Sequence, residues 1–243
     1  MSGTYEDMAR LRLDETAGGN EQEPTQTPRA TVGQVPITVV EPERHSRGGI
    51  VLLHESREFT GQLRNLMNAL AAEGWTVVAP DLFHRATASS SGVFGDELFE
   101  DFDACFDWLT RRGVFPDCIG ALGFDTAGTA AFLVATNRPI GAAISVAAPG
   151  IVDPLSAQAD ALVTVADRLQ APWLGLFGSD ETTPPDEVDK LRDACAKAPV
   201  ASLVISYPGQ LHRADKPGSD DDDEAELVDA QTRIFDWFDS HLR

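Results

Sequence analysis

The chain has 243 residues, of which 42% are hydrophobic, and this is enough for one large globular domain. Its net charge of −20 argues against nucleic acid and anionic membranes as partners. We expect no signal peptide, no apolar run is long enough to span a membrane, and the three scattered cysteines lack metal-binding spacing. We therefore expect a cytoplasmic protein without a metal site.

The chain begins with a polar segment. Residues 1–30 are mixed in charge and lack a sustained apolar face, so we expect a tail or a loosely held arm. Residues 31–243 are expected to form the folded domain. It starts with short strands, including one at residues 36–40, on an antiparallel edge.

From residue 49 onward, short apolar runs alternate with segments of helical periodicity. The apolar runs predict strands at residues 49–53, 75–79, 119–123, 140–147, 173–177 and 200–207. The periodic segments predict helices around residues 63–71, 98–109, 126–135, 162–169, 188–195 and 227–238. This alternation indicates a doubly wound, mostly parallel α/β sheet, which binds ligands at the carboxyl ends of its strands.

One strand runs directly into a helix. The segment Gly123-Phe-Asp-Thr-Ala-Gly128 joins the strand at residues 119–123 to the next helix. This is the setting of a nucleophile elbow, in which a tight turn holds one side chain at the end of a parallel strand. Counted from Gly123 in the G-x-Nu-x-G pattern, the nucleophile's place falls on Asp125 and the second glycine's place on Ala127. Ser or Cys usually stands where Asp125 stands here.

Polar side chains also follow the other strands, in the order nucleophile position, acid, histidine that is typical of α/β-hydrolases. Over residues 31–243 the chain resembles the dienelactone hydrolase family. Five short segments carry the resemblance: Gly-Ile-Val-Leu-Leu-His-Glu55, Ala-Pro-Asp-Leu-Phe-His-Arg85, Leu-Gly-Phe-Asp-Thr-Ala-Gly128, Leu-Gly-Leu-Phe-Gly-Ser-Asp180 and Tyr-Pro-Gly-Gln-Leu-His212. It implies the α/β-hydrolase fold and cofactor-free hydrolysis of a small-molecule ester or lactone. The connection over residues 149–172 has room for one helix, so we expect no cap domain.

The resemblance assigns catalytic roles to matching residues. His212 would move protons, oriented by Asp180 or, because the loop is about one residue short, by Glu181. Backbone N–H groups of Ser56 and Thr126 would form the oxyanion hole.

It also assigns residues around the substrate. Arg85 and Lys216 match positions where the family places cations for a substrate carboxylate, and Glu55 matches a glutamate that pairs with the family's Cys nucleophile. His54 is a further substrate-binding candidate. Structural alternatives stay open, because Arg85 can pair with Asp81, Lys216 can be a solvated loop residue, and His54 can be a hydrogen-bonded residue at a strand end.

The chain departs from the family pattern at the nucleophile's position, where Asp125 replaces the nucleophilic cysteine. By position in the sequence, none of Cys105, Cys118 and Cys195 can take over. Aspartate is also a favoured helix N-cap, so Asp125 could serve only to stabilise the helix.

Three functions follow from this substitution. The chain could be a dienelactone-hydrolase-like enzyme with an atypical elbow, or an Asp-nucleophile dehalogenase or epoxide hydrolase that attacks an alkyl carbon. It could also be a non-catalytic member of the family that binds a small acid or a protein partner. The oligomeric state stays open.

Overall fold

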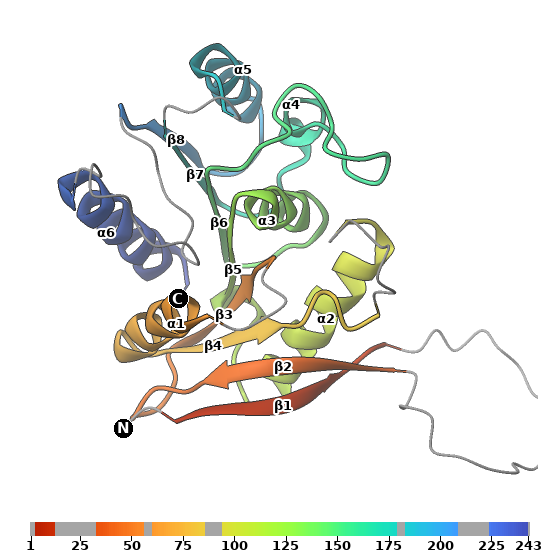
Figure 1. Cartoon of the computed structure of the whole chain (residues 1–243), viewed down its shortest axis with the longest axis vertical. Helices are drawn as coiled ribbons and strands as arrows, with labels where there is room; N and C mark the ends of the chain where they lie inside the picture. The colour runs from red at the N-terminus through yellow and green to blue at the C-terminus, as the bar shows by residue number, and fades with distance from the viewer. Residues whose placement is uncertain are drawn as a thin grey trace, which may run out of the picture.

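The computed structural model describes residues 3–12, 33–55, 60–85, 94–178, 183–208 and 224–242. Eight strands form one sheet with helices on both sides (Figure 1). The strands are β1 (Thr4–Arg10), β2 (Gln34–Val40), β3 (Gly48–Leu53), β4 (Trp75–Pro80), β5 (Ile119–Phe124), β6 (Ala142–Val146), β7 (Trp173–Phe177) and β8 (Ser202–Ser206). The helices are α1 (Gly61–Ala72), α2 (Asp96–Arg111), α3 (Thr126–Asn137), α4 (Leu162–Val165), α5 (Pro185–Cys195) and α6 (Glu224–His241), with 3-10 turns η1 (Pro116–Cys118) and η2 (Ala166–Arg168). None of the helices in the described ranges is long and apolar enough to cross a membrane.

The strand order is β1-β2-β4-β3-β5-β6-β7-β8. From β4 to β8 every neighbouring pair is parallel, whereas β1 with β2 and β2 with β4 are antiparallel. Every residue of β3, β4, β6 and β7 is buried, as expected for parallel strands covered on both faces. The doubly wound, mostly parallel α/β fold and its antiparallel edge are therefore confirmed.

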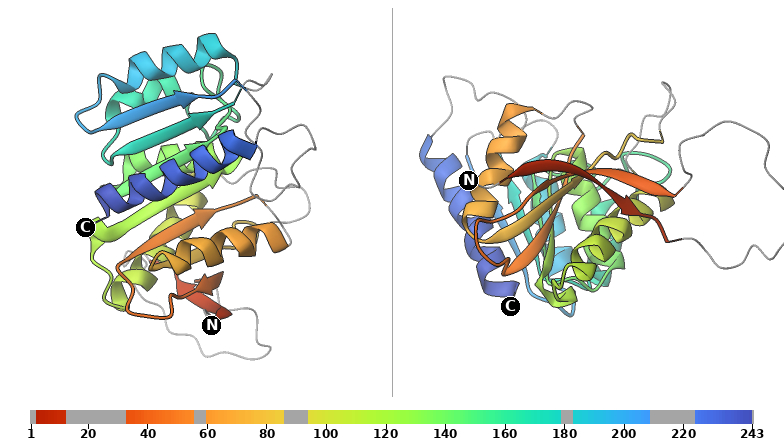
Figure 2. Two further views of the ribbon diagram at one scale, coloured as in Figure 1. Left: turned by 90° about the vertical axis from the view of Figure 1, so that its left-hand side faces the viewer. Right: turned by 90° about the horizontal axis from the view of Figure 1, so that it is seen from below.

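The helices form a layer on each face of the sheet (Figures 1 and 2). Helices α1 and α6 share one hydrophobic core with the sheet, to which they contribute Leu70 and Phe238. Helices α2, α3 and α5 share the other core, to which they contribute Phe102, Phe132 and Leu191. Helix α3 is buried almost all round, because it lies between the sheet and its neighbouring helices.

The connection between β6 and β7 contains little secondary structure. In residues 147–172, all of which are described, the helical residues are the four of α4 and the three of η2, and one isolated β-bridge joins Ser156 and Ala159. The single helix predicted around residues 162–169 is thus split into two short turns. This connection contains no cap domain, as expected.

Strand β1 comes from the segment that we expected to be a polar tail. Thr4–Arg10 pairs with Gln34–Val40 along its whole length. Only Ala9 of this strand is fully buried, and alternate residues face solvent. The apolar pattern is therefore too weak to reveal a strand, and long-range contacts fix it instead.

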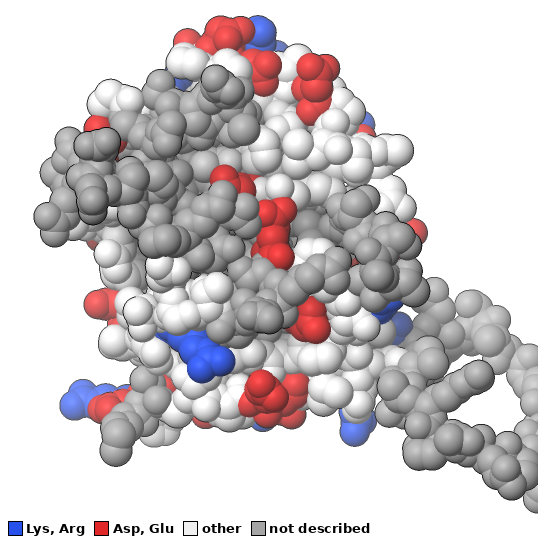
Figure 3. All heavy atoms as spheres, viewed as in Figure 1, with Lys and Arg blue, Asp and Glu red and all other residues white. Residues whose placement is uncertain are grey.

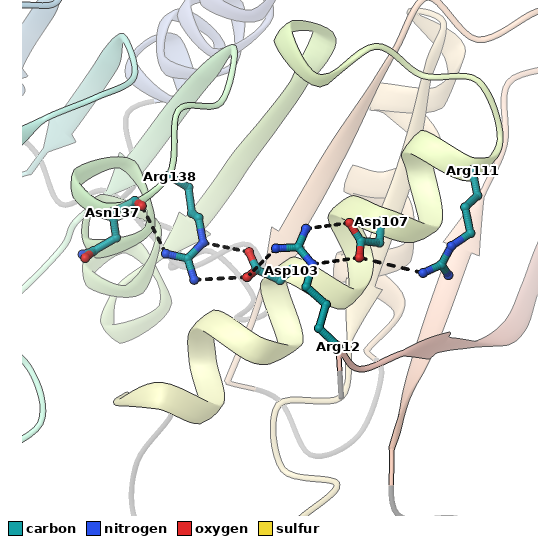
Figure 4. Close-up of polar contacts among 6 residues, drawn as sticks. All are labelled: Arg12, Asp103, Asp107, Arg111, Asn137 and Arg138. Atoms are coloured by element: carbon teal, nitrogen blue, oxygen red, sulfur yellow. Dashed lines mark hydrogen bonds and ion pairs between the residues drawn. The ribbon is translucent and has the colours of Figure 1, made fainter. Parts of the chain in front are cut away.

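Charged contacts tie the end of β1 to α2 and α3 (Figure 4). The Arg12 guanidinium donates to both oxygens of Asp107, at 2.9 and 2.6 Å, and to Asp103 at 3.1 Å. Arg138, just after α3, donates to the two oxygens of Asp103 at 2.8 and 3.1 Å, and Arg111 lies 3.8 Å from Asp107. Two carboxylates thus share three arginines (Figure 4). Elsewhere, the face of the molecule drawn in Figure 3 shows more acidic than basic side chains.

We expect Arg12→Gln to lower the free energy of unfolding by about 1 kcal/mol at neutral pH, because Asp107 loses a bidentate partner. The hydrogen bond from Arg12 lowers the pKa of Asp107 from its ordinary value. A lowered folded-state pKa stabilises the fold above the unfolded-state pKa, and this contribution is lost as the pH falls through the lowered value.

The difference between wild type and Arg12→Gln in urea unfolding should therefore shrink as the pH falls from about 7 to about 3. The exposed Arg168 of η2 gives a matched control, and Arg168→Gln should change stability little at either pH. A loss in Arg12→Gln that is the same at both pH values would contradict the ion-pair explanation.

Candidate functional site

Asp125 is the single residue between β5 and α3. Its backbone has φ 50° and ψ −125°, the conformation of the first central residue of a type II′ turn, where Gly, Asn and Asp predominate. Its N–H donates to the carbonyl of Val146 at 2.8 Å, and its carbonyl accepts from the N–H of Thr129 at 3.1 Å. The structure thus places Asp125 in the predicted strand-turn-helix setting at the carboxyl end of β5.

Two glycines make this turn possible. A Cβ atom at Gly123 would lie 2.0 Å from the carbonyl oxygen of Ala127, so no other residue fits without moving the helix. A Cβ atom at Gly128 would lie 3.0 Å from the carbonyl oxygen of Val146. The second position at which the backbones approach closely is therefore Gly128. The second-glycine place of the G-x-Nu-x-G pattern, one residue earlier, is occupied by the buried Ala127.

A chain of hydrogen bonds anchors the first turn of α3 to the sheet. The Trp173 indole N–H of β7 donates to the Ser145 hydroxyl of β6 at 2.9 Å, and that hydroxyl donates to the carbonyl of Gly128 at 2.7 Å. The hydroxyl of Thr129 donates to the carbonyl of Pro149 at 2.6 Å. Our sequence analysis did not identify these positioning residues; the only signal for Ser145 is a polar residue inside an apolar strand.

The Asp125 carboxylate does not act as a hydrogen-bonding cap. It stands at the N-cap position of α3, but its side chain makes no capping hydrogen bond. A capping aspartate normally has an extended backbone and accepts an N–H from the first turn. A hydrogen-bonding cap is therefore not what places Asp125 here, whereas stabilisation of the helix dipole by its carboxylate stays a prediction. The backbone at Asp125 carries strain of about 1–3 kcal/mol.

Glu55 and Asp125 follow neighbouring strands. In the pairing of β3 with β5, Leu53 lies beside Gly123, and the two acids each follow two residues later. Adjacent strands are about 4.8 Å apart, so the ends of β3 and β5 bring both acids to one edge of the sheet. His54, which precedes Glu55 in the chain, is buried.

Thr126 begins helix α3 immediately after Asp125. The first N–H groups of a helix have no acceptor within the helix, and they favour negative charge. Its N–H therefore suits the oxyanion-hole role, which stays a prediction.

Arg85 follows β4 but is bound by helix α2. It donates to Asp101 at 2.7 Å and forms an ion pair with Glu100 at 3.1 Å. His84 Nε2 lies 3.2 Å from both oxygens of Asp101. Arg85 therefore pairs with Asp101 and not with Asp81, whose carboxylate accepts a backbone N–H of its own turn at 2.9 Å.

The cysteines are buried and cannot supply a thiolate in place of Asp125. Burial raises the pKa of Cys195 to about 12 and that of Cys105 well above its ordinary value. Burial and the neighbouring Asp117 also raise the pKa of Cys118. Since the thiolate is the reactive form, none of the three is activated.

The remaining candidates lie outside the described residues: Ser56, Asp180, Glu181, His212 and Lys216. Gly178, directly after β7, is the last described residue before the candidate acids. Pro208, shortly after β8, is the last described residue before His212. A triad of Asp125, an acid and His212 therefore stays a prediction.

Comparison with known proteins places this geometry among hydrolases. The sequence model of the dienelactone hydrolase family matches residues 35–242. A carboxymethylenebutenolidase from Rhodococcus opacus is 28% identical over 200 residues, which cover 75% of this chain and 77% of that protein. A provisionally named carboxymethylenebutenolidase from Salmonella typhimurium is 28% identical over 229 residues, which cover 87% of this chain and 79% of that protein. The crystal structure of a provisionally named dienelactone hydrolase from Klebsiella pneumoniae shares the fold, with a TM-score of 0.76 at 21% identity over 98% of this chain and 99% of that one.

Proposed function

Because the chain belongs to the dienelactone hydrolase family, we propose that it hydrolyses a small ester or lactone at the carboxyl edge of its sheet, without a cofactor. One observation carries this proposal. Asp125 stands in the nucleophile's place, with a strained backbone, at the carboxyl end of β5 and directly before the N-terminus of α3. Strain of this kind concentrates at functional sites.

We assign Asp125 to the activation of water. A carboxylate that attacked an ester carbonyl would form a mixed anhydride, which is more reactive than the ester itself. Asp125 instead accepts a proton from a water molecule while the water oxygen bonds to the carbonyl carbon. Glu55, at the end of the neighbouring strand, would hold the same water by a hydrogen bond.

The other groups complete the reaction. The N–H groups of Thr126 and Ser56 would stabilise the oxyanion of the tetrahedral intermediate. When the bond to the leaving oxygen breaks, protonated His212, oriented by Asp180 or Glu181, gives its proton to the departing alkoxide. Asp125 passes its own proton to solvent, and His212 is reprotonated from solvent, so the net reaction is ester plus water to acid plus alcohol.

The alternative of a dehalogenase or epoxide hydrolase receives no structural support. Those enzymes carry a cap domain, whereas the helical residues of 147–172 are those of α4 and η2 alone. The non-catalytic alternative is an outcome of the following test.

The test is the isosteric change Asp125→Asn, which removes the proton acceptor and keeps the shape of the side chain. We expect kcat/KM on small esters and lactones to fall by a factor of about 100 or more, because general acid–base catalysis typically contributes about 100- to 10,000-fold. Initial rates over a panel of aliphatic esters and five- and six-membered lactones would measure it.

Asp167→Asn, an exposed change in η2, is the matched control and should keep wild-type rates. Absence of hydrolysis across the whole panel in the wild type would favour the non-catalytic alternative. Equal rates in wild type and Asp125→Asn would show that the chemistry lies elsewhere in the chain.

A further inference from the structure

We infer that Ser145, with its hydroxyl oriented by Trp173, is a positioning residue for Asp125. The hydroxyl holds the strained backbone of the elbow from the neighbouring strands, and that backbone sets the direction of the Asp125 side chain. The inference rests on the proposed function and adds the residues that keep its central carboxylate in place.

The direction of the Ser145 hydroxyl follows from its two neighbours. Ser145 lies in β6 and is completely buried, with its Oγ 2.9 Å from the Trp173 indole nitrogen and 2.7 Å from the Gly128 carbonyl oxygen. An indole N–H can only donate, so Ser145 accepts from Trp173. A serine hydroxyl carries a single proton, which is therefore directed to Gly128.

The Trp173 indole is itself held by packing. A Cβ atom at Gly175 would lie 2.3 Å from the indole carbon Cη2, so the ring lies directly against this glycine of β7. The ring also meets Phe132 of α3 edge-on, with ring centroids 4.8 Å apart and planes at 89°. Because the indole is completely buried in close packing between sheet and helix, its N–H has little freedom to turn away from Ser145.

A series of hydrogen bonds continues from this hydroxyl to Asp125. The Gly128 carbonyl and the Thr129 N–H belong to the same peptide group, and that N–H donates to the Asp125 carbonyl at 3.1 Å. Since a peptide group is planar, the bond from Ser145 to its carbonyl also fixes the direction of its N–H. The carbonyl side of Asp125 is thus connected to Trp173 of β7.

A second series of hydrogen bonds holds the other side of Asp125. Its N–H donates to the Val146 carbonyl at 2.8 Å, and the N–H of that same peptide group, which belongs to Ala147, donates to the Leu176 carbonyl at 2.7 Å. Ala147 and Asp125 are the non-glycine residues with positive φ in the described ranges. Both series end on β7, at Trp173 and at Leu176, so the elbow is tied to this strand through its N–H and through its carbonyl.

Loss of one series would allow the elbow to relax. A strained backbone persists only where its surroundings over-determine it. Ser145→Ala removes the first series, and the Asp125 carboxylate and the Thr126 N–H would move with the backbone that carries them. A displacement of about 1 Å in groups that act on a substrate can slow a reaction about 100-fold.

Steady-state kinetics of Ser145→Ala test this inference on the ester or lactone that the wild type hydrolyses fastest. We expect kcat to fall about 10- to 100-fold with KM within about twofold of the wild type, because positioning acts in the transition state and not on uniform binding. Ser145→Thr keeps the hydroxyl and should recover most of the loss. Thr136→Val is the matched control, since it removes a buried hydroxyl that donates to the Leu133 carbonyl of the same helix at 2.8 Å, and it should keep the wild-type kcat.

A double-mutant cycle tests the part played by Trp173. Trp173→Phe keeps an aromatic ring but removes the N–H, so the Ser145 hydroxyl is free to turn. It should lower kcat about 3- to 10-fold, as expected for the loss of one hydrogen bond. Combined with Ser145→Ala it should lower kcat little further, because no hydroxyl remains to be oriented. Fully additive losses would show that Trp173 does not act through Ser145.

Amide hydrogen exchange measures the same effect without turnover. In Ser145→Ala, exchange at the amides of Asp125 and Thr129 should accelerate about tenfold more than at Leu70 of α1, which packs in the core on the other face of the sheet. If Ser145→Ala does not fold, Ser145→Cys, which has a similar volume and a weak donor, takes its place in both measurements and should show smaller effects in the same direction.

Three outcomes would overturn the inference: a loss of kcat no greater than in Thr136→Val, a loss that appears in KM alone, or equal acceleration of exchange at all three amides. A wild type that hydrolyses no ester or lactone would overturn the proposed function, and the exchange measurement would then decide this inference by itself.

Discussion

Asp125→Cys should hydrolyse p-nitrophenyl acetate at least about 100-fold faster than the wild type, because a thiolate forms an acyl-enzyme and a carboxylate does not. The N-terminus of α3 directly follows this position, and a helix N-terminus favours the thiolate over the thiol. The backbone of Asp125 is fixed by the carbonyl of Val146, so the new side chain should keep the same direction.

The acyl-enzyme gives this prediction a second measurement. Mass spectrometry of the intact protein should detect an acetylated Asp125→Cys enzyme during turnover, and stopped-flow absorbance should show a burst of p-nitrophenolate. Asp167→Cys supplies a thiol at an exposed place and controls for unassisted thiol chemistry. No gain over that control would mean that His212 and the oxyanion hole are not assembled around Asp125.

Gly123→Ala should destabilise the protein by about 3 kcal/mol or more, among the largest effects of a single substitution. The added Cβ would lie 2.0 Å from the carbonyl oxygen of Ala127. Relief by moving α3 is opposed by the hydrogen bond from Ser145 to Gly128 and by close packing of the helix. Urea unfolding monitored by circular dichroism would measure the loss, and hydrolysis should fail together with stability.

Gly61→Ala is the matched control for this prediction. Gly61 is the first residue of α1, and nothing lies within 4 Å of the position that its Cβ would take. Alanine has a higher helix propensity than glycine, so this change should stabilise the protein by up to about 1 kcal/mol. Similar unfolding free energies for both variants would show that the elbow adjusts easily.

The parts of the fold that the sequence predicted have local causes. Fully apolar runs predicted the parallel strands, and the spacing of Gly123 and Asp125 predicted the elbow. Each of these signals lies within a few residues of the feature that it encodes, since a strand or a tight turn is determined mainly by its own residues.

What the sequence could not predict depends on contacts between distant residues. Strand β1 is anchored by Arg12, whose partner Asp107 lies 95 residues away. For Arg85, the sequence suggested the nearby Asp81, whereas the actual partner is Asp101 on the next helix. The sequence gives the type of a charged side chain, but only the packing of helix on sheet decides which opposite charge it meets.

Half of the candidate site remains a prediction for a related reason. Asp125, Thr126 and Glu55 are attached to strand ends, so the sheet register determines where they lie. The sequence predicts that His212 and its acid lie in loops after β8 and β7, outside the described residues, and local periodicity does not predict loop geometry.

The helix latest in the sequence has a consequence for how the protein acquires its structure during synthesis. Helix α6 packs Phe238 against Trp75 of β4, with ring centroids 5.9 Å apart, and the same ring fills the space above Gly120 of β5. Every strand in the described ranges precedes α6 in the chain, so the part of this sheet face that α1 does not cover stays open until α6 emerges from the ribosome. At about 5–20 residues per second, the interval between synthesis of β5 and of α6 lasts several seconds or more. During that interval the glycine-lined apolar surface of β5 is open to chaperones and to other nascent chains, which makes α6 the step that ends the protein's exposure to aggregation.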